Sequence, residues 1–240
     1  MQQVNFTSTD PAEQLACDEA LLDRAEEGRI GECLRLYELS RPTVVMGLQD
    51  QHRRAARWKQ CHRKGVVLLR RRSGGGTVLL GPGCLLYSLV LRCDRPELGS
   101  IRRSYRWILG RLAEELSSDR IEVSRDGTSD LVWEGRKVGG SAQQRKRDYL
   151  LHHGTLLYDM RPELMEEFVG EPRLPPPYRA GRTHREFVVN LPYQREQLRG
   201  AVRKAFGPVE KGAASPPGLQ KRIASLVEAR YHRSGWTLRR

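Results

Sequence analysis

The sequence of 240 residues lacks the marks of several protein classes. No apolar run approaches the roughly 18 residues that a membrane helix requires. The first ten residues show no basic region followed by an apolar core, so no secretory signal can be read. Acidic residues are scarce beside basic ones, 29 against 42. We therefore expect a cytoplasmic protein whose surface is strongly basic.

Cysteine is also scarce, and the spacing of the cysteines is typical of neither a disulfide framework nor a zinc site. The five cysteines are odd in number and include no C-x-x-C pair, which argues against a disulfide framework and against a zinc ribbon. We expect reduced and mostly buried thiols. Cys84 follows a Gly-Pro-Gly turn and lies near the glycine-rich loop described below, so it is the thiol to test for reactivity.

The net charge of +13 predicts an anionic partner. Nucleic acid is one alternative, because basic surfaces bind phosphate chains by releasing counterions. An acidic protein partner is the other, drawn in by the same long-range field. The sequence has no zinc-finger spacing, RNP-like aromatic motif or basic zipper that would support binding to nucleic acid.

Two glycine-rich segments indicate where the chemistry takes place. Residues 70–78 read Arg-Arg-Arg-Ser-Gly-Gly-Gly-Thr-Val. Three glycines allow backbone N–H groups to approach a phosphate or carboxylate closely, because no Cβ blocks the anion. Residues 136–142 read Arg-Lys-Val-Gly-Gly-Ser-Ala. Lys137 in this segment can place a positive charge beside a reacting acyl or phosphoryl oxygen.

Hydrophobic spacing predicts a mixed α+β architecture. Apolar residues recur at helical spacing over residues 100–117, and a helix is expected from Asp10 to about Gly28, with Asp10 as N-cap and Glu13 closing a capping box. Residues 77–80 and 85–91 are expected to be strands joined by the Gly-Pro-Gly turn. Short strands near 121–123, 131–133, 137–138 and 154–157 favour a mixed sheet with a site on its loops. We expect a catalytic domain at residues 1–192 and a short helical C-terminal extension at 193–240, divided internally by residues 212–217.

Three motifs resemble the lipoate-protein ligase A family, within the superfamily of biotin and lipoate ligases and octanoyl transferases. They are the Arg-Arg-x-Ser-Gly-Gly-Gly loop, the Asp-Leu that precedes an Arg-Lys-Val-x-Gly-Ser-Ala segment, and the His-Gly-Thr-Leu-Leu strand at residues 153–157. The resemblance implies an α+β catalytic domain with a mixed sheet and flanking helices, of the kind shared with class II aminoacyl-tRNA synthetases.

The resemblance also implies roles for particular residues. Lys137 would be catalytic, between the acyl carbonyl and the phosphate, and Asp130 would hold Mg²⁺. The other implied residues would bind the nucleotide or the lipoyl-adenylate. They are Arg70, Arg71, Ser73, Gly74, Gly75, Gly76, Thr77, Val78, Leu79, Gly140, Ser141, Ala142, His153 and Gly154.

The resemblance leaves two reactions open. An ATP-dependent ligase would form lipoyl-AMP from ATP, Mg²⁺ and lipoate or octanoate, and would transfer the acyl group to a lysine of an acidic lipoyl domain or an H-type protein, with or without a separate accessory subunit. The alternative is an ATP-independent transferase that takes octanoyl or lipoyl from a carrier protein through a cysteine thioester. No cysteine lies near residues 126–131 or after the lysine segment, where the transferase branches carry theirs, so such a route would have to use Cys84 or Cys17. The ligase is therefore the main hypothesis, and a basic nucleic-acid-binding protein is a third.

Overall fold

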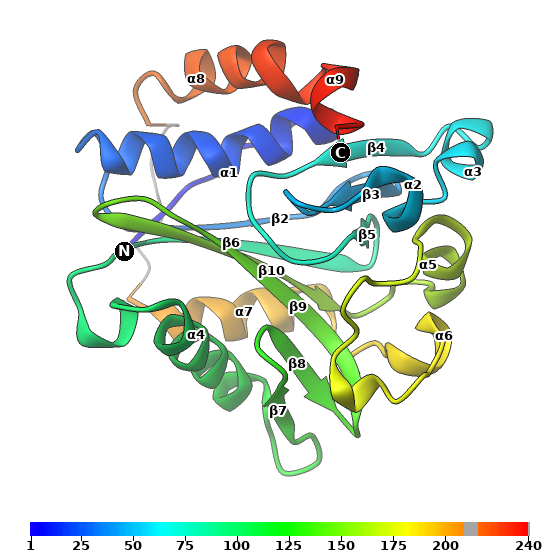
Figure 1. Ribbon diagram of the computed structural model, residues 1–240. Helices are drawn as coiled ribbons and strands as arrows, with labels where there is room; N and C mark the ends of the chain where they lie inside the picture. Colours follow the sequence, from blue (N-terminus) through cyan, green and yellow to red (C-terminus); the bar gives the residue numbers. More distant parts are fainter. Residues whose placement is uncertain (209–215, 240) are drawn as a thin grey trace.

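Two β-sheets form the scaffold of the protein. The computed structural model describes residues 1–208 and 216–239 (Figure 1). In this part the larger sheet has the strand order β1-β2-β6-β10-β9-β8-β7, and the smaller has the order β4-β3-β5. The strands are β1 (Gln2–Gln3), β2 (Cys33–Tyr37), β3 (Thr43–Met46), β4 (Val67–Arg70), β5 (Val78–Leu80), β6 (Cys84–Arg92), β7 (Val123–Asp126), β8 (Asp130–Trp133), β9 (Arg136–Arg145) and β10 (Tyr149–Leu157).

Helices cover both faces of the larger sheet. In Figure 1, α1 and α8 lie on one side of it, and α4 and α7 lie on the other. The helices are α1 (Pro11–Glu26), α2 (His52–Ala55), α3 (Trp58–Arg63), α4 (Ile101–Leu116), α5 (Pro162–Phe168), α6 (His184–Phe187), α7 (Arg195–Phe206), α8 (Leu219–Leu226) and α9 (Ser234–Thr237). Short 3-10 turns occur at Pro96–Leu98 and Pro177–Arg179, and a π-turn occurs at Val227–Tyr231.

The core is divided into two clusters by the larger sheet. One lies between this sheet, α1, α8 and the smaller sheet, and the other lies under α4 and α7. Parallel and antiparallel pairs coexist, since β1 and β2 are parallel while β6 is antiparallel to both β2 and β10. The expected α+β fold with a mixed sheet and flanking helices is confirmed. Among the described residues, no helix combines the length and apolarity needed to cross a membrane.

The first helix begins where the sequence predicts, but its cap differs. Asp10 is the N-cap, and its side chain accepts a hydrogen bond from the Ala12 amide at 2.9 Å. The expected capping box is wrong, because Glu13 accepts a hydrogen bond from the Ser8 hydroxyl at 2.6 Å instead of from the cap backbone. The Asp10 amide donates to the Ser8 hydroxyl oxygen at 3.0 Å, so Ser8, two residues before the cap, takes over the reciprocal half of the box.

The Gly-Pro-Gly turn joins two strands that belong to different sheets. β5 pairs with β3 in the smaller sheet, whereas β6 lies between β2 and β10 in the larger one. Gly83 has a φ of +81°, and a Cβ there would overlap the Asp159 backbone. A residue with a side chain would therefore be strained and crowded at this crossing between sheets.

The basic segment between β3 and β4 forms two short helices, α2 and α3. Ala56, between them, is extended and forms an isolated antiparallel bridge with Val169. The Arg57 amide also donates to the Phe168 carbonyl at 2.9 Å. These bonds tie the basic segment to the end of α5.

The C-terminal segment packs on α1 within the same core. Leu219, Ile223 and Tyr231 belong to the cluster that contains the apolar residues of α1. Arg222 bonds Asp23, and the Tyr231 hydroxyl donates to Glu19. The division expected at residues 212–217 lies, up to residue 215, outside the described residues.

Candidate functional site

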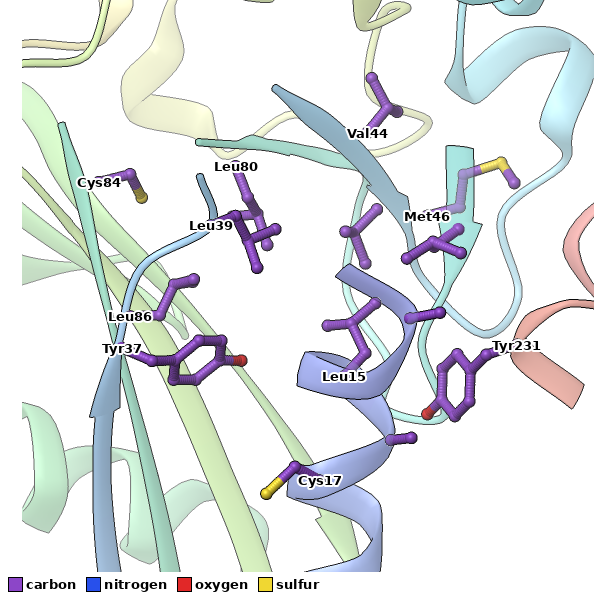
Figure 2. Close-up of a cluster of buried hydrophobic side chains, with 14 of the residues drawn as sticks. Leu15, Cys17, Tyr37, Leu39, Val44, Met46, Leu80, Cys84, Leu86 and Tyr231 are labelled. Atoms are coloured by element: carbon purple, nitrogen blue, oxygen red, sulfur yellow. The ribbon is translucent and has the colours of Figure 1, made fainter. Parts of the chain in front are cut away.

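A cavity of about 420 Å³ is walled by both sheets. Part of its lining is apolar and includes the buried side chains of Leu15, Leu80 and Leu86. Figure 2 shows these three in one cluster, where α1 meets β5 and β6. Another part carries Lys137 and the backbone of the glycine-rich loop. The cavity therefore combines a surface suited to an acyl chain with a positive charge and backbone donors.

Most of the residues singled out from the sequence line this one cavity. The loop and the lysine segment are far apart in the chain, and the fold brings them together. The predicted residues in the lining are Arg71, Gly75, Gly76, Thr77, Val78, Leu79, Asp130, Lys137, Gly140, Ser141, Ala142, His153 and Gly154.

The glycine-rich loop has a conformation that depends on its lack of side chains. Gly75 has a φ of +80°, in the left-handed region that favours glycine. Gly47, in the turn after β3, approaches so closely that a Cβ there would overlap the Gly75 carbonyl oxygen. Within the described residues, the amides of Gly75 and Gly76 donate to no protein acceptor. These amides are therefore available to an anion in the cavity.

Arg71 holds the loop from the protein side. Its Nη2 donates to the carbonyls of Gly74 at 2.6 Å and Gly76 at 2.8 Å, and its Nη1 donates to Val45 at 3.2 Å. Burial lowers the pKa of the Arg71 guanidinium to about 10. With the carbonyls bound in this way, the loop is fixed before any ligand enters.

Arg70, Ser73 and Gly74 do not line the cavity. Arg70 is fully buried and donates to the carbonyls of Gly47 at 2.7 Å and Thr237 at 3.1 Å, among others. It thereby joins the turn after β3 to the C-terminal helix. The structure gives these three residues a part in shaping the loop, and direct contact with a nucleotide remains a prediction for them.

Lys137 points into the cavity from a distorted part of β9. Its partner strand β8 pairs Leu131 with Gly139 but Val132 with Lys137, so Val138 is an extra residue in the ladder. Such a bulge turns the side chains beside it away from the regular alternation. A Cβ at Gly140 would lie 2.7 Å from Lys137 Nζ. Glycine at position 140 therefore leaves room for the ammonium group.

Asp130 and Tyr178 hold the ammonium group in place. Lys137 Nζ donates to Asp130 Oδ1 at 2.7 Å, and the Tyr178 hydroxyl donates to Oδ2 of the same carboxylate at 2.8 Å. Asp130 is buried, while the Lys137 side chain remains 27% exposed. The lysine can therefore meet a ligand while its orientation is fixed by its partner.

Asp130 has little capacity left for a metal ion. Oδ1 also accepts from the Ser129 hydroxyl at 3.2 Å, so both oxygens already have protein donors. No group of three or more His, Cys, Asp or Glu residues in the described part of the chain is arranged to hold a metal. The geometry favours Asp130 as the partner of Lys137, and we assign no step to magnesium.

His153 links the glycine-rich loop to the first helix. Its Nε2 lies 2.6 Å from Ser73 Oγ, and its Nδ1 lies 3.3 Å from Asp18 Oδ2. Asp18 is buried in an ion pair with Arg35 at 2.7 Å. Burial alone would raise the pKa of Asp18, but Arg35 and the hydrogen bonds from His153 and Ser88 outweigh it and lower the pKa. This network keeps the loop in register with β10.

The cysteines stay out of the cavity, and all five lie in the described part of the chain. Cys17, Cys33, Cys61 and Cys84 are buried, Cys93 is half-buried, and none is a lining residue. Figure 2 shows Cys17 and Cys84 within the hydrophobic cluster. Burial raises the pKa of Cys17 to about 12 and that of Cys84 further still. Neither thiol is placed or ionised as a nucleophile would need to be.

Tyr178 and Asp18 are not among the site residues predicted from the sequence. Tyr178 follows three prolines, which predict only an extended connector. Asp18 lies among the apolar positions of α1, where a charged residue indicates a buried partner. That signal was available in the sequence, whereas the position of Tyr178 depends on the tertiary fold.

Solved structures with the same architecture identify the class of fold. The bipartite lipoate protein ligase of Thermoplasma acidophilum superimposes with a TM-score of 0.83 at 18% identity, over 99% of this chain and 95% of that one. A crystal structure of lipoate-protein ligase A bound with ATP gives a TM-score of 0.82 at 18% identity, over 99% and 98% of the two chains. The fold is that of the lipoate ligase catalytic domain.

Sequence comparison then identifies the family. Residues 10–206 match the family described as the lipoyl protein ligase A/B catalytic domain, and the chain belongs to it. The resemblance inferred from the three motifs is thereby confirmed, and the protein is an enzyme of the lipoate ligase and octanoyltransferase family.

Curated relatives carry the name of the transferase branch. Octanoyltransferase LipM of Brevibacillus brevis is 27% identical over the full length of both chains. That of Carboxydothermus hydrogenoformans is 34% identical over 174 positions, which cover 65% of this chain and 64% of the relative. These names support the transferase alternative more than the ATP-dependent ligase that the sequence analysis preferred.

Proposed function

We propose that the protein transfers an octanoyl or lipoyl group to a lysine side chain of an acceptor protein domain. The observation that carries this proposal is the placement of the Lys137 ammonium group, the unpaired Gly75 and Gly76 amides, and an apolar lining in one cavity. The family and the names of the curated relatives support the same class of reaction.

The residues of the cavity supply what such a transfer needs. The apolar side chains bind the acyl chain and exclude water around its carbonyl carbon. When the amine of the acceptor lysine attacks this carbon, negative charge develops on the carbonyl oxygen. Lys137 stabilises that charge, and the hydrogen bond to Asp130 keeps the ammonium group oriented. The C–N bond forms, the bond to the leaving group breaks, and the proton of the amine leaves with that group or to solvent.

An octanoyl group on a carrier protein is the donor that the relatives favour. The cysteine positions restrict how such a donor could react. Because no thiol lines the cavity, we propose that the acceptor amine attacks the carrier thioester directly. The C–S bond then breaks and the carrier thiol takes the proton.

An acyl-adenylate is the second candidate donor, and the missing cavity thiol is the observation that favours it. In that route the free acid is activated with ATP, and the amides of Gly75 and Gly76 bind the phosphate. The acceptor amine displaces AMP, so a C–O bond breaks instead of a C–S bond. Lys137 is needed equally in both routes.

One assay tests the proposal and separates the donors. Purified protein is incubated with an unmodified E2 lipoyl domain and either octanoyl-carrier protein or octanoate with ATP and Mg²⁺, and the acceptor mass is measured. A mass increase of one octanoyl group with the carrier alone supports transfer, and an increase only with ATP supports ligation. Cys84→Ser is expected to keep full activity in either case. The proposed function would be refuted if the acceptor is modified with neither donor, and if it also stays unmodified when lipoate replaces octanoate.

A further inference from the structure

A basic surface adjoins the cavity and has no partner in the described structure. Residues 52–64 carry six lysines and arginines and no acidic residue. The six are Arg53, Arg54, Arg57, Lys59, Arg63 and Lys64, and all are exposed. Of these, Lys64 forms an ion pair, with Glu167, and the other five form none with the described residues. We call residues 52–64 the α2–α3 surface.

An exposed tryptophan lies in the middle of this basic surface. Trp58, at the start of α3, is 42% exposed, although nearby Ala55 and Cys61 are buried. Tryptophan and arginine are enriched among the residues that contribute most of the binding energy in protein–protein contacts. The composition of this surface thus fits an anionic protein with an apolar contact, better than it fits solvent alone.

Backbone hydrogen bonds hold this surface beside residues that line the cavity. The Gly170 amide donates to the Ala55 carbonyl at 3.0 Å, and Ala56 pairs with Val169, which itself lines the cavity. Arg54 lines a second, smaller cavity of about 50 Å³ that shares Gly76 with the main one. A protein bound to the α2–α3 surface would therefore lie beside residues that line the cavity containing Lys137.

We propose that the α2–α3 surface docks the acceptor domain through an acidic face of that domain. This inference rests on the proposed function, because it is the transfer reaction that requires a protein lysine at the cavity. The unpaired arginines and lysine attract the acidic face, and Trp58 packs at the centre of the contact. A folded acceptor domain would contact both the cavity and the α2–α3 surface, whereas a free lysine would contact only the cavity. This difference would make the protein specific for the folded domain.

Charge reversal on this surface tests the proposal. The variant R53E/R57E/K59E removes three positive charges and adds three negative ones. A matched control, R102E/R103E/R106E, makes the same change on exposed arginines of α4, which lies away from α2 and α3 in Figure 1 and lines no part of the cavity. An unmodified E2 lipoyl domain is the probe, and its Kd is measured by isothermal titration at low salt.

The expected result is at least about a tenfold weaker Kd for R53E/R57E/K59E, against less than about a twofold change for the control. Trp58→Ala is expected to weaken binding without changing the net charge. Equal losses in the two charge variants, or no loss in the first, would overturn the docking proposal even if the protein is active. Binding that depends on this surface in a protein that modifies no acceptor would instead refute the proposed function and leave the docking site standing. A short DNA duplex is tested as a competitor of the lipoyl domain. If it binds tightly, displaces the lipoyl domain and no longer binds R53E/R57E/K59E, the surface would be assigned to nucleic acid and the proposal would be overturned.

Discussion

Replacing Lys137 by alanine is the most direct test of the site. The change removes the ammonium group 2.7 Å from Asp130 and leaves that buried carboxylate with its hydrogen bonds from Ser129 and Tyr178. Loss of one charged donor to a developing oxyanion lowers kcat by about 10²–10³-fold. We expect a loss of at least about 100-fold in acyl transfer, measured as acceptor mass against time with either donor.

The stability of this variant should fall much less than its activity. Breaking a fully buried ion pair costs about 3–5 kcal/mol, but the lysine is partly exposed and water can replace it. We expect about 1 kcal/mol, which corresponds to about 2–4 °C in Tm for a chain of this size. The measurement is a thermal unfolding scan of parent and variant under the assay conditions.

The chain contains a matched control for this experiment. Lys146 forms an ion pair of the same length, 2.7 Å, with buried Asp23, and its side chain is 33% exposed compared with 27% for Lys137. Asp23 retains Arg222 when Lys146 is removed, and Lys146 does not line the cavity. Lys146→Ala should lower Tm by a similar or smaller amount and keep full activity. A rate for Lys137→Ala within about tenfold of the parent rate, or an equal loss of activity in the two variants, would refute a role for Lys137 in acyl transfer.

Two further changes probe the surroundings of the lysine, and a third probes a buried histidine of β10. Gly140→Ala should displace the Lys137 ammonium group and lower kcat by about 100-fold. Gly110→Ala in α4, where a Cβ meets open space, is the control and should keep the activity. Equal rates in the two variants would show that a Cβ at position 140 does not displace the ammonium group. Tyr178→Phe should keep the aromatic packing but lose the hydrogen bond to Asp130, which lowers the unfolding free energy by about 1 kcal/mol. We expect a lower kcat at an unchanged acceptor KM. An unchanged kcat would show that this hydroxyl does not position the lysine. Burial lowers the pKa of His152 from 6.5 to about 3, so the folded protein keeps this imidazole neutral. The unfolded chain binds a proton at this histidine below pH 6.5, so the stabilisation from the neutral imidazole is present above pH 6.5 and is lost as the pH falls toward 3. In urea unfolding at pH 7, 5 and 4, His152→Gln should show a flatter decline than the parent, and an equally steep decline would assign the acid sensitivity to other groups.

Local features of the fold were predictable from the sequence, and long-range ones were not. Apolar periodicity predicted a helix over residues 100–117, and α4 forms at Ile101–Leu116, because this periodicity is set within one helix. The two strands around the Gly-Pro-Gly turn were also predicted, but nothing in their sequence indicates that they belong to different sheets. That separation follows from pairing with β3 and with β2 and β10, which are distant in the chain.

The same distinction holds within the site. The glycines and the lysine could be predicted because their chemistry depends on residue type at short spacing. The partners of the lysine could not all be predicted. Asp130 was predicted as a metal ligand, and its pairing with Lys137 depends on a bulge that no residue pattern reveals. Tyr178 reaches the carboxylate from a proline-rich segment 48 residues away, so its role appears only in the folded chain.

The choice between donors rests on what differs between the two reactions. Both require an acyl carbon held in an apolar cavity and a positive charge beside its oxygen, and Lys137 with its surroundings meets that need for a thioester or an adenylate. The donors differ only in the leaving group, a thiol or a phosphate. A transferase that stores the acyl group on itself must also place a thiolate in the cavity, and the five cysteines of this chain lie outside it. If the protein is an octanoyltransferase like its named relatives, it therefore transfers without an enzyme thioester, and acid quenching during turnover should trap no acylated form of the enzyme.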